Sequence, residues 1–303
     1  MVRDVDADRL DRFLVRHWSG CSRRLARLAI DGGAVQVNGQ RGRKGQPLQP
    51  GDTVRADRRA LQRAPAAQPD LAVPLLYEDA EVIAVEKPAG MPSVALRADD
   101  RETIVNYLIA RYPELEAVGD AAFEAGLVHR LDTATSGVLV VGRTDAAWRR
   151  LRAQFRERAV DKLYLAVVQG RVRQRGTVSA PIAHRPRRPR EMLACVDRER
   201  AHALRARPAL THYRRLRWQR GAALLGVRIP TGVRHQIRVH LASIGHPVLG
   251  DPLYAADAAA RATPRLMLHA ARIAFAHPAD GRRVIIRSRL PDDFQAALRS
   301  FGM

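Results

Sequence analysis

The sequence predicts an α+β protein in which a small domain of two helices and a hairpin precedes a larger domain with a mixed, largely antiparallel sheet. Residues 9–57 combine two stretches of helical apolar spacing with alternating residues and turn signals. In residues 74–303, expected strands meet at hairpin turns and are interrupted by helices, an order typical of α+β domains. Residues 58–73 are rich in Ala, Pro and Arg without a sustained period, which indicates a linker.

The small domain begins with residues 9–18, "RLDRFLVRHW", whose apolar side chains share one face of a helix. Residues 21–33, "CSRRLARLAIDGG", repeat this spacing until the glycine pair ends the second helix. The alternating segment "AVQVNGQ" contains Asn38-Gly39, the strongest short signal for a hairpin turn. The segment "QPLQPGDTVRA" supplies a further turn and strand.

The larger domain opens with "VPLLYEDAEVIAVEKPAGMPS", an apolar strand that runs into a turn. Residues 138–144, "VLVVGRT", predict another strand, and Thr144 suits the N-cap of a helix over residues 145–159. The remaining expected elements are strands at 161–170 and 176–183, a hairpin at 209–230 and a helix within 234–245. Asp132 therefore lies on the loop that leads into a buried strand.

Charge is the most informative feature of the composition. The chain has 52 Lys and Arg against 31 Asp and Glu, a formal net charge of +21, and its only lysines are Lys44, Lys87 and Lys162. A GC-rich genome would explain the choice of Arg over Lys, but it would not explain the net charge. The excess predicts a polyanionic partner, because the planar guanidinium fork suits phosphate and stacks on bases.

Other classes of protein are disfavoured. No apolar run approaches the length of a bilayer helix, and the charged first 18 residues lack the apolar centre of a signal peptide. Cys21 and Cys195 stand far apart without a metal-ligand pattern, so we expect reduced thiols and no zinc. These features predict a cytoplasmic protein without a membrane segment.

The segment "LVHRLDTATSGVLVV", residues 127–141, places Asp132 between a basic pair and a buried strand. The neighbouring Arg130 favours the ionised carboxylate, which can act as a nucleophile, a base or a salt-bridge anchor. No second carboxylate lies close by in the sequence, and the chain has neither a Gly-x-Ser-x-Gly elbow nor a Walker loop. From these residues alone, a loop acid that caps a turn or bridges to Arg130 remains an alternative.

Residues 9–57 resemble the ribosomal-protein S-four type of RNA-binding domain. The segments "RLDRFL", "SRRLARLAIDGGAVQVNGQ" and "LQPGDTV" follow the order and spacing of that family. The resemblance implies that a helix pair and a hairpin present a basic surface to structured RNA, to which Arg23, Arg24 and Arg27 belong. A solvated helix face is the alternative interpretation of these arginines.

Residues 74–298 resemble the RluA type of pseudouridine synthase. "HRLDTATSGVLVV" is similar to its signature, His-Arg-Leu-Asp, two variable residues and Thr-Ser-Gly before an apolar strand. Further blocks follow in family order: "EKPAG", "KLYLAVVQG", "GTVSAPI", "ALTHY", "TGVRHQIRVHLASIGHPVLGDPLY", "LHA" and "HPADG". The resemblance implies the pseudouridine synthase fold and an isomerase that uses neither cofactor nor metal.

The same resemblance implies three catalytic residues. Asp132 matches the essential nucleophile, although attack on the sugar and a route through a glycal both remain open. Tyr164 matches the aromatic platform for the flipped uracil and is a possible proton carrier; a strand aromatic in the core is the alternative. Arg238 matches the arginine that pairs with the catalytic carboxylate.

RNA contacts are expected at further positions. Arg130 resembles the arginine that enters the RNA helix as the target base leaves, with an ordinary surface arginine as the alternative. His129, His235 and Arg234 are expected to contact RNA. His129 and His235, together with His240, lack the partners and spacing of a metal site, and some of the three histidines could instead be structural.

The sequence departs from the family pattern at three places. The usual Thr-Gly-Arg-Thr-His-Gln is Thr-Gly-Val-Arg-His-Gln at residues 231–236, so a basic side chain has moved by one position. Gly142-Arg143 replaces the usual Ala-Lys, and residues 184–208 are more basic and less regular than expected. These changes preserve the expected chemistry but leave the target site open.

We therefore expect a monomeric pseudouridine synthase acting on structured RNA, above all on large-subunit ribosomal RNA. Transfer RNA is the alternative substrate. A catalytically silent RNA-binding or ribosome-assembly protein is the rival from another class, since charge and the front domain would suit it equally well.

Overall fold

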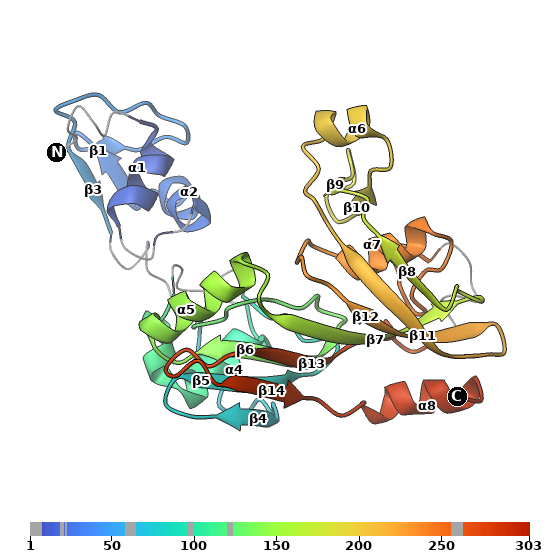
Figure 1. The fold of residues 1–303 in the computed structure, drawn as a ribbon. Coiled ribbons are helices and arrows are strands. Elements are labelled where there is room, and N and C mark those ends of the chain that lie inside the picture. Colours follow the sequence, from blue (N-terminus) through green and yellow to red (C-terminus); the bar gives the residue numbers. More distant parts are fainter. Residues whose placement is uncertain are drawn as a thin grey trace. The chain divides into compact units, whose positions relative to one another are not determined.

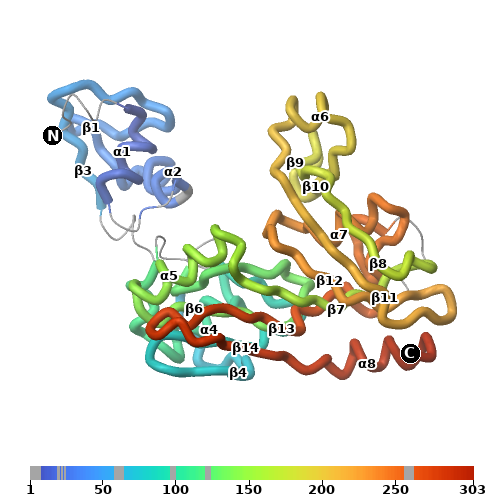
Figure 2. The backbone as a smooth tube through the Cα atoms, in the orientation of Figure 1, coloured from blue at the N-terminus to red at the C-terminus, as the bar shows by residue number. Residues whose placement is uncertain are grey.

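The computed structural model describes the chain in seven stretches (Figures 1 and 2). These are residues 8–18, 21, 23–57, 65–95, 100–119, 124–255 and 263–303. The chain forms two compact units, one made of Met1–Ala72, Val94–Leu127 and Gly142–Trp148, and the other of Val73–Ser93, Val128–Val141 and Arg149–Met303. Residues 58–64 of the expected linker lie outside the described residues, and the domain boundaries inferred from sequence stay predictions.

The N-terminal part of the first unit contains α1 (Leu10–His17), α2 (Arg23–Asp31) and a three-stranded sheet. Its strands β1 (Val35–Val37), β2 (Gln40–Arg41) and β3 (Val54–Ala56) are antiparallel, with β1 in the middle. Asn38 and Gly39 join β1 to β2 with φ of 52° and 79°, as a tight two-residue hairpin turn requires. The expected helix pair and hairpin are thus confirmed.

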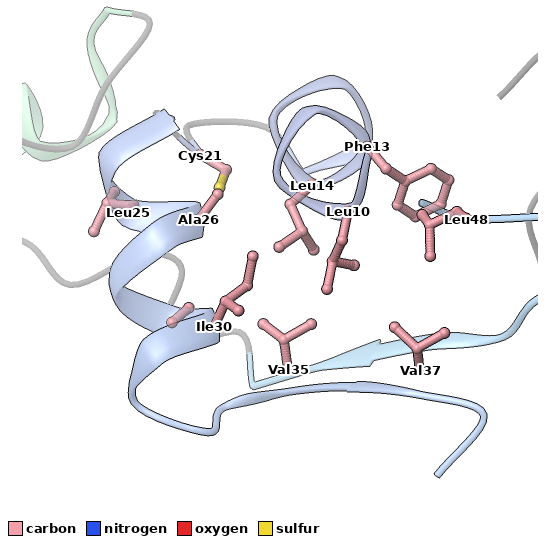
Figure 3. Close-up of a cluster of buried hydrophobic side chains, with 11 residues drawn as sticks. Leu10, Phe13, Leu14, Cys21, Leu25, Ala26, Ile30, Val35, Val37 and Leu48 are labelled. Carbon is pink, nitrogen blue, oxygen red and sulfur yellow. The ribbon is translucent and has the colours of Figure 1, made fainter. Parts of the chain in front are cut away.

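An apolar core of its own holds this part together. Figure 3 shows Leu10 and Leu14 of α1 turned toward Ile30 of α2 and Val35 of β1. All four side chains are buried, and each would contribute about 1.5–3 kcal/mol relative to an exposed position. The first unit also contains α4 (Ile104–Arg111), whose N-cap is Thr103, and the 3₁₀ helix η2 (Pro113–Ala117).

The second unit is built on a nine-stranded sheet. The strand order is β4-β5-β6-β13-β7-β12-β11-β8, and β14 also pairs with β13. Their bounds are β4 Leu75–Glu78, β5 Val82–Lys87, β6 Ser136–Gly142, β7 Asp161–Gln169, β8 Arg175–Val178, β11 Thr211–Gln219, β12 Ala222–Arg228, β13 Leu268–Ala276 and β14 Arg283–Arg287. β13 is parallel to β6 but antiparallel to β7 and β14, so the mixed, largely antiparallel sheet is confirmed.

The helices begin near their expected positions. Helix α5 (Asp145–Arg156) starts after Thr144, whose hydroxyl accepts a hydrogen bond from the Ala147 amide at 3.1 Å. Helix α7 (Gln236–Ser243) follows the hairpin of β11 and β12, and α8 (Asp292–Ser300) lies near the C-terminus. No helix in the described stretches is long and apolar enough to cross a membrane.

One expected strand is wrong. Residues 176–183 divide into β8, which joins the large sheet, and β9 (Ile182–His184), which pairs with β10 (Met192–Ala194) in a separate hairpin. Pro181 lies at the break and has no amide hydrogen with which to continue a ladder. The short helix α6 (Arg198–Ala203) follows β10.

Candidate active site

The Asp132 loop is held from both sides by hydrogen bonds to its backbone. The Ser93 hydroxyl donates to the Leu131 carbonyl and accepts from the Leu131 amide, at 3.0 and 3.1 Å. Lys87, which is fully buried, donates to the carbonyls of Thr133, Pro88 and Met91 at 2.6–2.9 Å. Burial lowers the pKa of Lys87 to about 7, while the nearby charge of Asp132 acts in the opposite direction. These three carbonyl oxygens match the three hydrogens that Lys87 carries in its ammonium form.

The parallel pairing of β6 with β13 fixes the strand that follows this loop. Ser136 lies opposite His269, and the Ser136 hydroxyl is 2.9 Å from His269 Nδ1. Gly137 has a φ of +117°, and a Cβ there would lie 2.3 Å from the Ala270 carbonyl oxygen. Only glycine permits this close approach. The motif segments around residues 136 and 269, distant in sequence, therefore pair in the sheet.

Arg238 reaches Asp132 from α7. The loop before this helix is stabilised by the buried Gln236, whose side-chain oxygen accepts from the Thr231 hydroxyl and the Val233 amide. Arg238 Nη1 donates to Asp132 Oδ2 at 3.1 Å. The Arg238 side chain is 5% exposed and that of Asp132 is 22% exposed, so the carboxylate is the accessible partner.

Asp251 holds the other side of Arg238. Arg238 Nε and Nη2 donate to the two carboxylate oxygens of Asp251 at 2.7 and 2.8 Å, a bidentate pairing that fixes the guanidinium plane. Asp251 is fully buried and also accepts from the amides of Leu253 and Tyr254. Burial opposes the charge of Arg238, but the hydrogen bond to Asp251 and the charges of Asp251 and Asp132 outweigh it and raise the pKa of Arg238.

None of the described residues donates a hydrogen bond to Asp132 Oδ1. Arg238 engages only Oδ2, and His235 Nε2 lies 4.0 Å from Oδ1, beyond hydrogen-bond distance. Burial lowers the pKa of His235 to about 4, although the charge of Asp132 acts against this shift, so the imidazole is neutral at pH 7. The site thus presents a partly exposed carboxylate that one buried cation orients.

Tyr164 lies on β7, opposite Val227 of β12 and Ala270 of β13. It is 7% exposed, and burial, together with the charge of Asp132, raises its pKa, so the phenol stays protonated. Within the described stretches its hydroxyl makes no hydrogen bond.

A second tyrosine completes the cluster. The Tyr254 hydroxyl lies 2.8 Å from His235 Nδ1 and accepts from the Met192 amide at 2.8 Å. Arg238 Cζ is 5.1 Å from the centre of the Tyr254 ring, within cation–π range. Tyr254 therefore links α7 to β10.

The structure brings Asp132, Tyr164, Arg238 and His235 together. Arg130 is exposed two residues before Asp132. His129 stacks on Phe155 and its Nε2 accepts from the Val140 amide at 3.1 Å. Burial lowers the pKa of His129 to about 3, so this side chain is neutral. Its contact with RNA stays a prediction, as does that of Arg130.

The other expected RNA contacts lie elsewhere. Arg234 is exposed and donates to the carbonyls of Pro189 and Arg190, both at 3.3 Å. In the first unit, Arg23 and Arg27 are exposed on α2, and Arg27 lies 3.6 Å from Asp31. The Arg24 side chain lies outside the described residues. The RNA contacts of these arginines stay predictions.

Sequence reasoning missed Lys87, Asp251 and Tyr254. All three stand inside the quoted blocks "EKPAG" and "GDPLY", so the blocks were the available signal. Their contacts could not be inferred because each depends on how distant segments meet. In the described part of the chain, no group of three or more His, Cys, Asp and Glu side chains could hold a metal ion.

Comparison with known proteins finds matches along most of the chain. Residues 81–243 match the RNA pseudouridylate synthase family and residues 8–54 match the S4 domain. An uncharacterised RNA pseudouridine synthase of Chloroflexus aurantiacus is 38% identical over 298 residues, which cover 97% of this chain and 90% of that protein. The ribosomal large subunit pseudouridine synthase D of Nitrosomonas europaea is 36% identical over 302 residues, covering 96% and 84%.

A solved structure supports the same assignment. Human RNA pseudouridylate synthase domain containing 1 is 27% identical, with a TM-score of 0.57 over 73% of this chain and 84% of that one. These matches confirm the expected fold and the expected RNA pseudouridine synthase activity, whereas the roles of Asp132, Tyr164 and Arg238 stay predictions. This chain therefore belongs to the RNA pseudouridylate synthase family, whose members isomerise uridine to pseudouridine in RNA.

Proposed function

We propose that Asp132 is the nucleophilic carboxylate of this pseudouridine synthase and that large-subunit ribosomal RNA is its substrate. The observation that carries the catalytic assignment is the pairing of a partly exposed Asp132 with a buried Arg238 through one oxygen only. A carboxylate held in this way is oriented and accessible, as nucleophilic catalysis requires.

The reaction breaks the bond between C1′ of the ribose and N1 of uracil and forms a bond from C1′ to C5. The detached base turns over, N1 gains a proton and C5 loses its hydrogen to solvent. Asp132 Oδ1 is the oxygen left without a hydrogen bond from the described residues, so it is the atom that meets the sugar. Attack at C1′ and proton removal toward a glycal both use this carboxylate, and both routes remain open.

Tyr164 supplies the flat surface for the detached base. Its ring comes from β7, and the Asp132 loop leads into β6; both strands flank β13. Stacking on an aromatic ring is worth about 1–3 kcal/mol per base, enough to retain a uracil that is no longer covalently bound. The protonated phenol can also carry a proton to or from the base.

Ribosomal RNA is favoured as the substrate by the names of several relatives, among them the Nitrosomonas europaea protein, called a large-subunit ribosomal enzyme. Residues 8–54, which match the S4 domain, would provide additional affinity for structured RNA. Such a substrate would place the reaction in the cytoplasm, where ribosomes assemble. One copy of the chain carries the whole cluster, so a monomer suffices.

The direct test is to map pseudouridine in all RNAs from cells with and without this protein. We expect the modification to disappear from one or more uridines of large-subunit ribosomal RNA and to return when the wild-type gene is restored. Loss confined to transfer RNA would replace the ribosomal substrate with a transfer-RNA one. An unchanged pseudouridine map would contradict the proposed activity in those cells.

Substitutions of Tyr164 separate the ring from the hydroxyl. We expect Tyr164→Phe to retain folding and RNA binding, whereas Tyr164→Ala loses more activity because the stacking surface is removed, a loss of about 1–3 kcal/mol. Tritium release from RNA labelled at C5 of uridine, at saturating enzyme, measures both variants. If Phe and Ala are equally inactive, the hydroxyl is the essential group and proton transfer its role.

The arginines of α2 are expected to provide affinity. Both Arg23 and Arg27 are exposed, so Arg23→Ala/Arg27→Ala should raise the Michaelis constant for structured RNA more than it lowers turnover. The salt dependence of binding should also become shallower, because fewer counterions are released. Titration of ribosomal RNA at several salt concentrations checks this expectation, and an unchanged slope with unchanged affinity would contradict it.

A further inference from the structure

Residues 182–207 form a strongly basic extension, which we call the arginine arm. It comprises the β9–β10 hairpin and α6, which project from the end of the large sheet near β8 and β11 (Figure 1). The arm has eight arginines against three acidic residues, a formal excess of five charges in 26 residues. It therefore contributes about a quarter of the net charge of +21 from less than a tenth of the chain.

The base of the arm is fixed to the helix that carries Arg238. Ile182 and Met192 of the arm share an apolar cluster with Val233 and Val239. His240, on α7, lies 2.8 Å from the Ala180 carbonyl just before the arm, and its own burial marks this contact as structural. The arm therefore occupies a defined position relative to α7, and through Arg238 relative to Asp132.

Residues 185–191, the arm turn, join β9 to β10 and present arginines of two kinds. Arg185 and Arg188 pair with Glu191 at 3.0 and 3.1 Å, which stabilises the turn. Arg187 and Arg190 are exposed, and neither has an acidic partner among the residues that the structure describes. Arg187 also has a φ of +62°, a conformation in which glycine would be less strained. A side chain kept in a strained position points to a role for that side chain.

Arg234 attaches the arm turn to the loop of the active site. It donates to the carbonyls of Pro189 and Arg190, and the next residue, His235, lies beside Asp132. Val233 occupies the position where the family pattern has arginine, and it is buried in the apolar cluster at the base of the arm. The shift of the basic residue by one position therefore leaves an apolar side chain at residue 233 and places the arginine where it holds the arm turn.

We propose that the arm turn binds the phosphate backbone of the substrate RNA next to the target uridine, with Arg187 and Arg190 as the contacting side chains and Arg234 as the positioning residue. This inference rests on the proposed function, since it assumes that the RNA is bound at Asp132. RNA is favoured over an acidic protein because the partner of the active site is itself a polyanion, and because two unpaired guanidinium groups match phosphate oxygens.

The test compares two double variants that remove the same charge. Arg187→Ala/Arg190→Ala changes the arm turn, and Arg287→Ala/Arg289→Ala removes two exposed arginines at and beyond the end of β14, on another part of the same unit. Binding of transcribed large-subunit ribosomal RNA and of transfer RNA is titrated at several salt concentrations. Tritium release from the same RNAs gives kcat/KM.

We expect the arm-turn variant to bind the substrate RNA about tenfold more weakly and to lose about 1.4–1.8 from the slope of log K against log salt, as for two phosphate contacts. Its kcat/KM should fall by a similar factor, and the β14 variant should change much less. Arg234→Thr alone should weaken RNA binding. When it is combined with Arg187→Ala/Arg190→Ala, it should weaken binding by less than about a further twofold, because both changes act through the same contacts.

Other outcomes overturn the proposal. If the two double variants lose RNA affinity equally, only net charge matters. An arm-turn variant that binds RNA like the wild type would assign the turn to another partner, such as an acidic protein. Full additivity of Arg234→Thr would remove its positioning role. Failure of the proposed function is distinguishable, since the wild type itself would then release no tritium while the binding comparison still reports on the arm turn.

Discussion

Replacing Asp132 by Asn is expected to lower pseudouridine formation by at least about a thousandfold, or ~4 kcal/mol of activation free energy. Asn has the size of Asp and can still meet Arg238, but it lacks the negative charge that a nucleophile or base needs. Binding of RNA should change by less than about threefold, because phosphate contacts spread over many arginines carry the affinity. Tritium release and equilibrium binding of the same RNA measure the two effects separately.

A matched control is Asp280→Asn, which removes an exposed acid that lies 3.1 Å from Arg282 Nε and 3.3 Å from His277 Nδ1. This variant should retain wild-type activity, since exposed ion pairs contribute about 0–1 kcal/mol. Substantial tritium release by the Asp132→Asn variant would refute the nucleophile assignment. A wild type that binds RNA but releases tritium from none of the cellular RNAs would instead indicate a silent RNA-binding member of the family.

Asp251→Asn is expected to have the next largest effect, although Asp251 does not face the substrate. Without its charge, Arg238 loses the bidentate partner that keeps it turned away from Asp132 Oδ1. Arg238 can then engage both oxygens of Asp132, which neutralises the carboxylate and blocks the open one. We expect a loss of about a hundredfold in single-turnover rate, or ~2.7 kcal/mol. The change also leaves a buried cation less compensated, at a cost of about 3–5 kcal/mol in unfolding free energy.

Urea unfolding and single-turnover tritium release separate these two consequences of Asp251→Asn. The rate is measured at a urea concentration and temperature where the variant is fully folded. Asp293→Asn is the control, because Asp293 also holds an arginine, Arg265, through two oxygens, but its side chain is 46% exposed. Asp293→Asn should lower neither the single-turnover rate nor the unfolding free energy by much. A folded Asp251→Asn variant with the wild-type rate would remove Asp251 from the positioning of Arg238.

Local sequence signals predicted those parts of the fold whose causes are local. Asn38-Gly39 forms the expected tight turn because only a few residue types accept positive φ at both positions. Thr144 caps α5 because its hydroxyl needs to reach only three residues along the chain. The sequence also predicted the hairpin of β11 and β12 and the helix α7, which the structure contains.

The break between β8 and β9 shows where such signals fail. Residues 176–183 have the composition of one strand, yet the chain leaves the large sheet at this point and enters the arginine arm. Pro181 marks the break, but the course of the chain after it depends on distant residues, because Ile182 joins an apolar cluster with Val233 and Val239, which come much later in the sequence. Strand propensity cannot carry that information, since it reflects packing against neighbours that the segment itself does not contain.

By itself the sequence determined the fold class and the basic character of the protein, and it predicted Asp132, Tyr164 and Arg238 as residues of the candidate site. Only the tertiary structure decided how they are used: that Asp251 takes two donors of Arg238 and leaves one for Asp132, and that Arg234 holds the arm turn. The physical reason is that a buried charge must be paired by whichever groups folding brings within hydrogen-bond distance. Composition and motif spacing specify the groups, but the packing of distant strands and helices sets those distances.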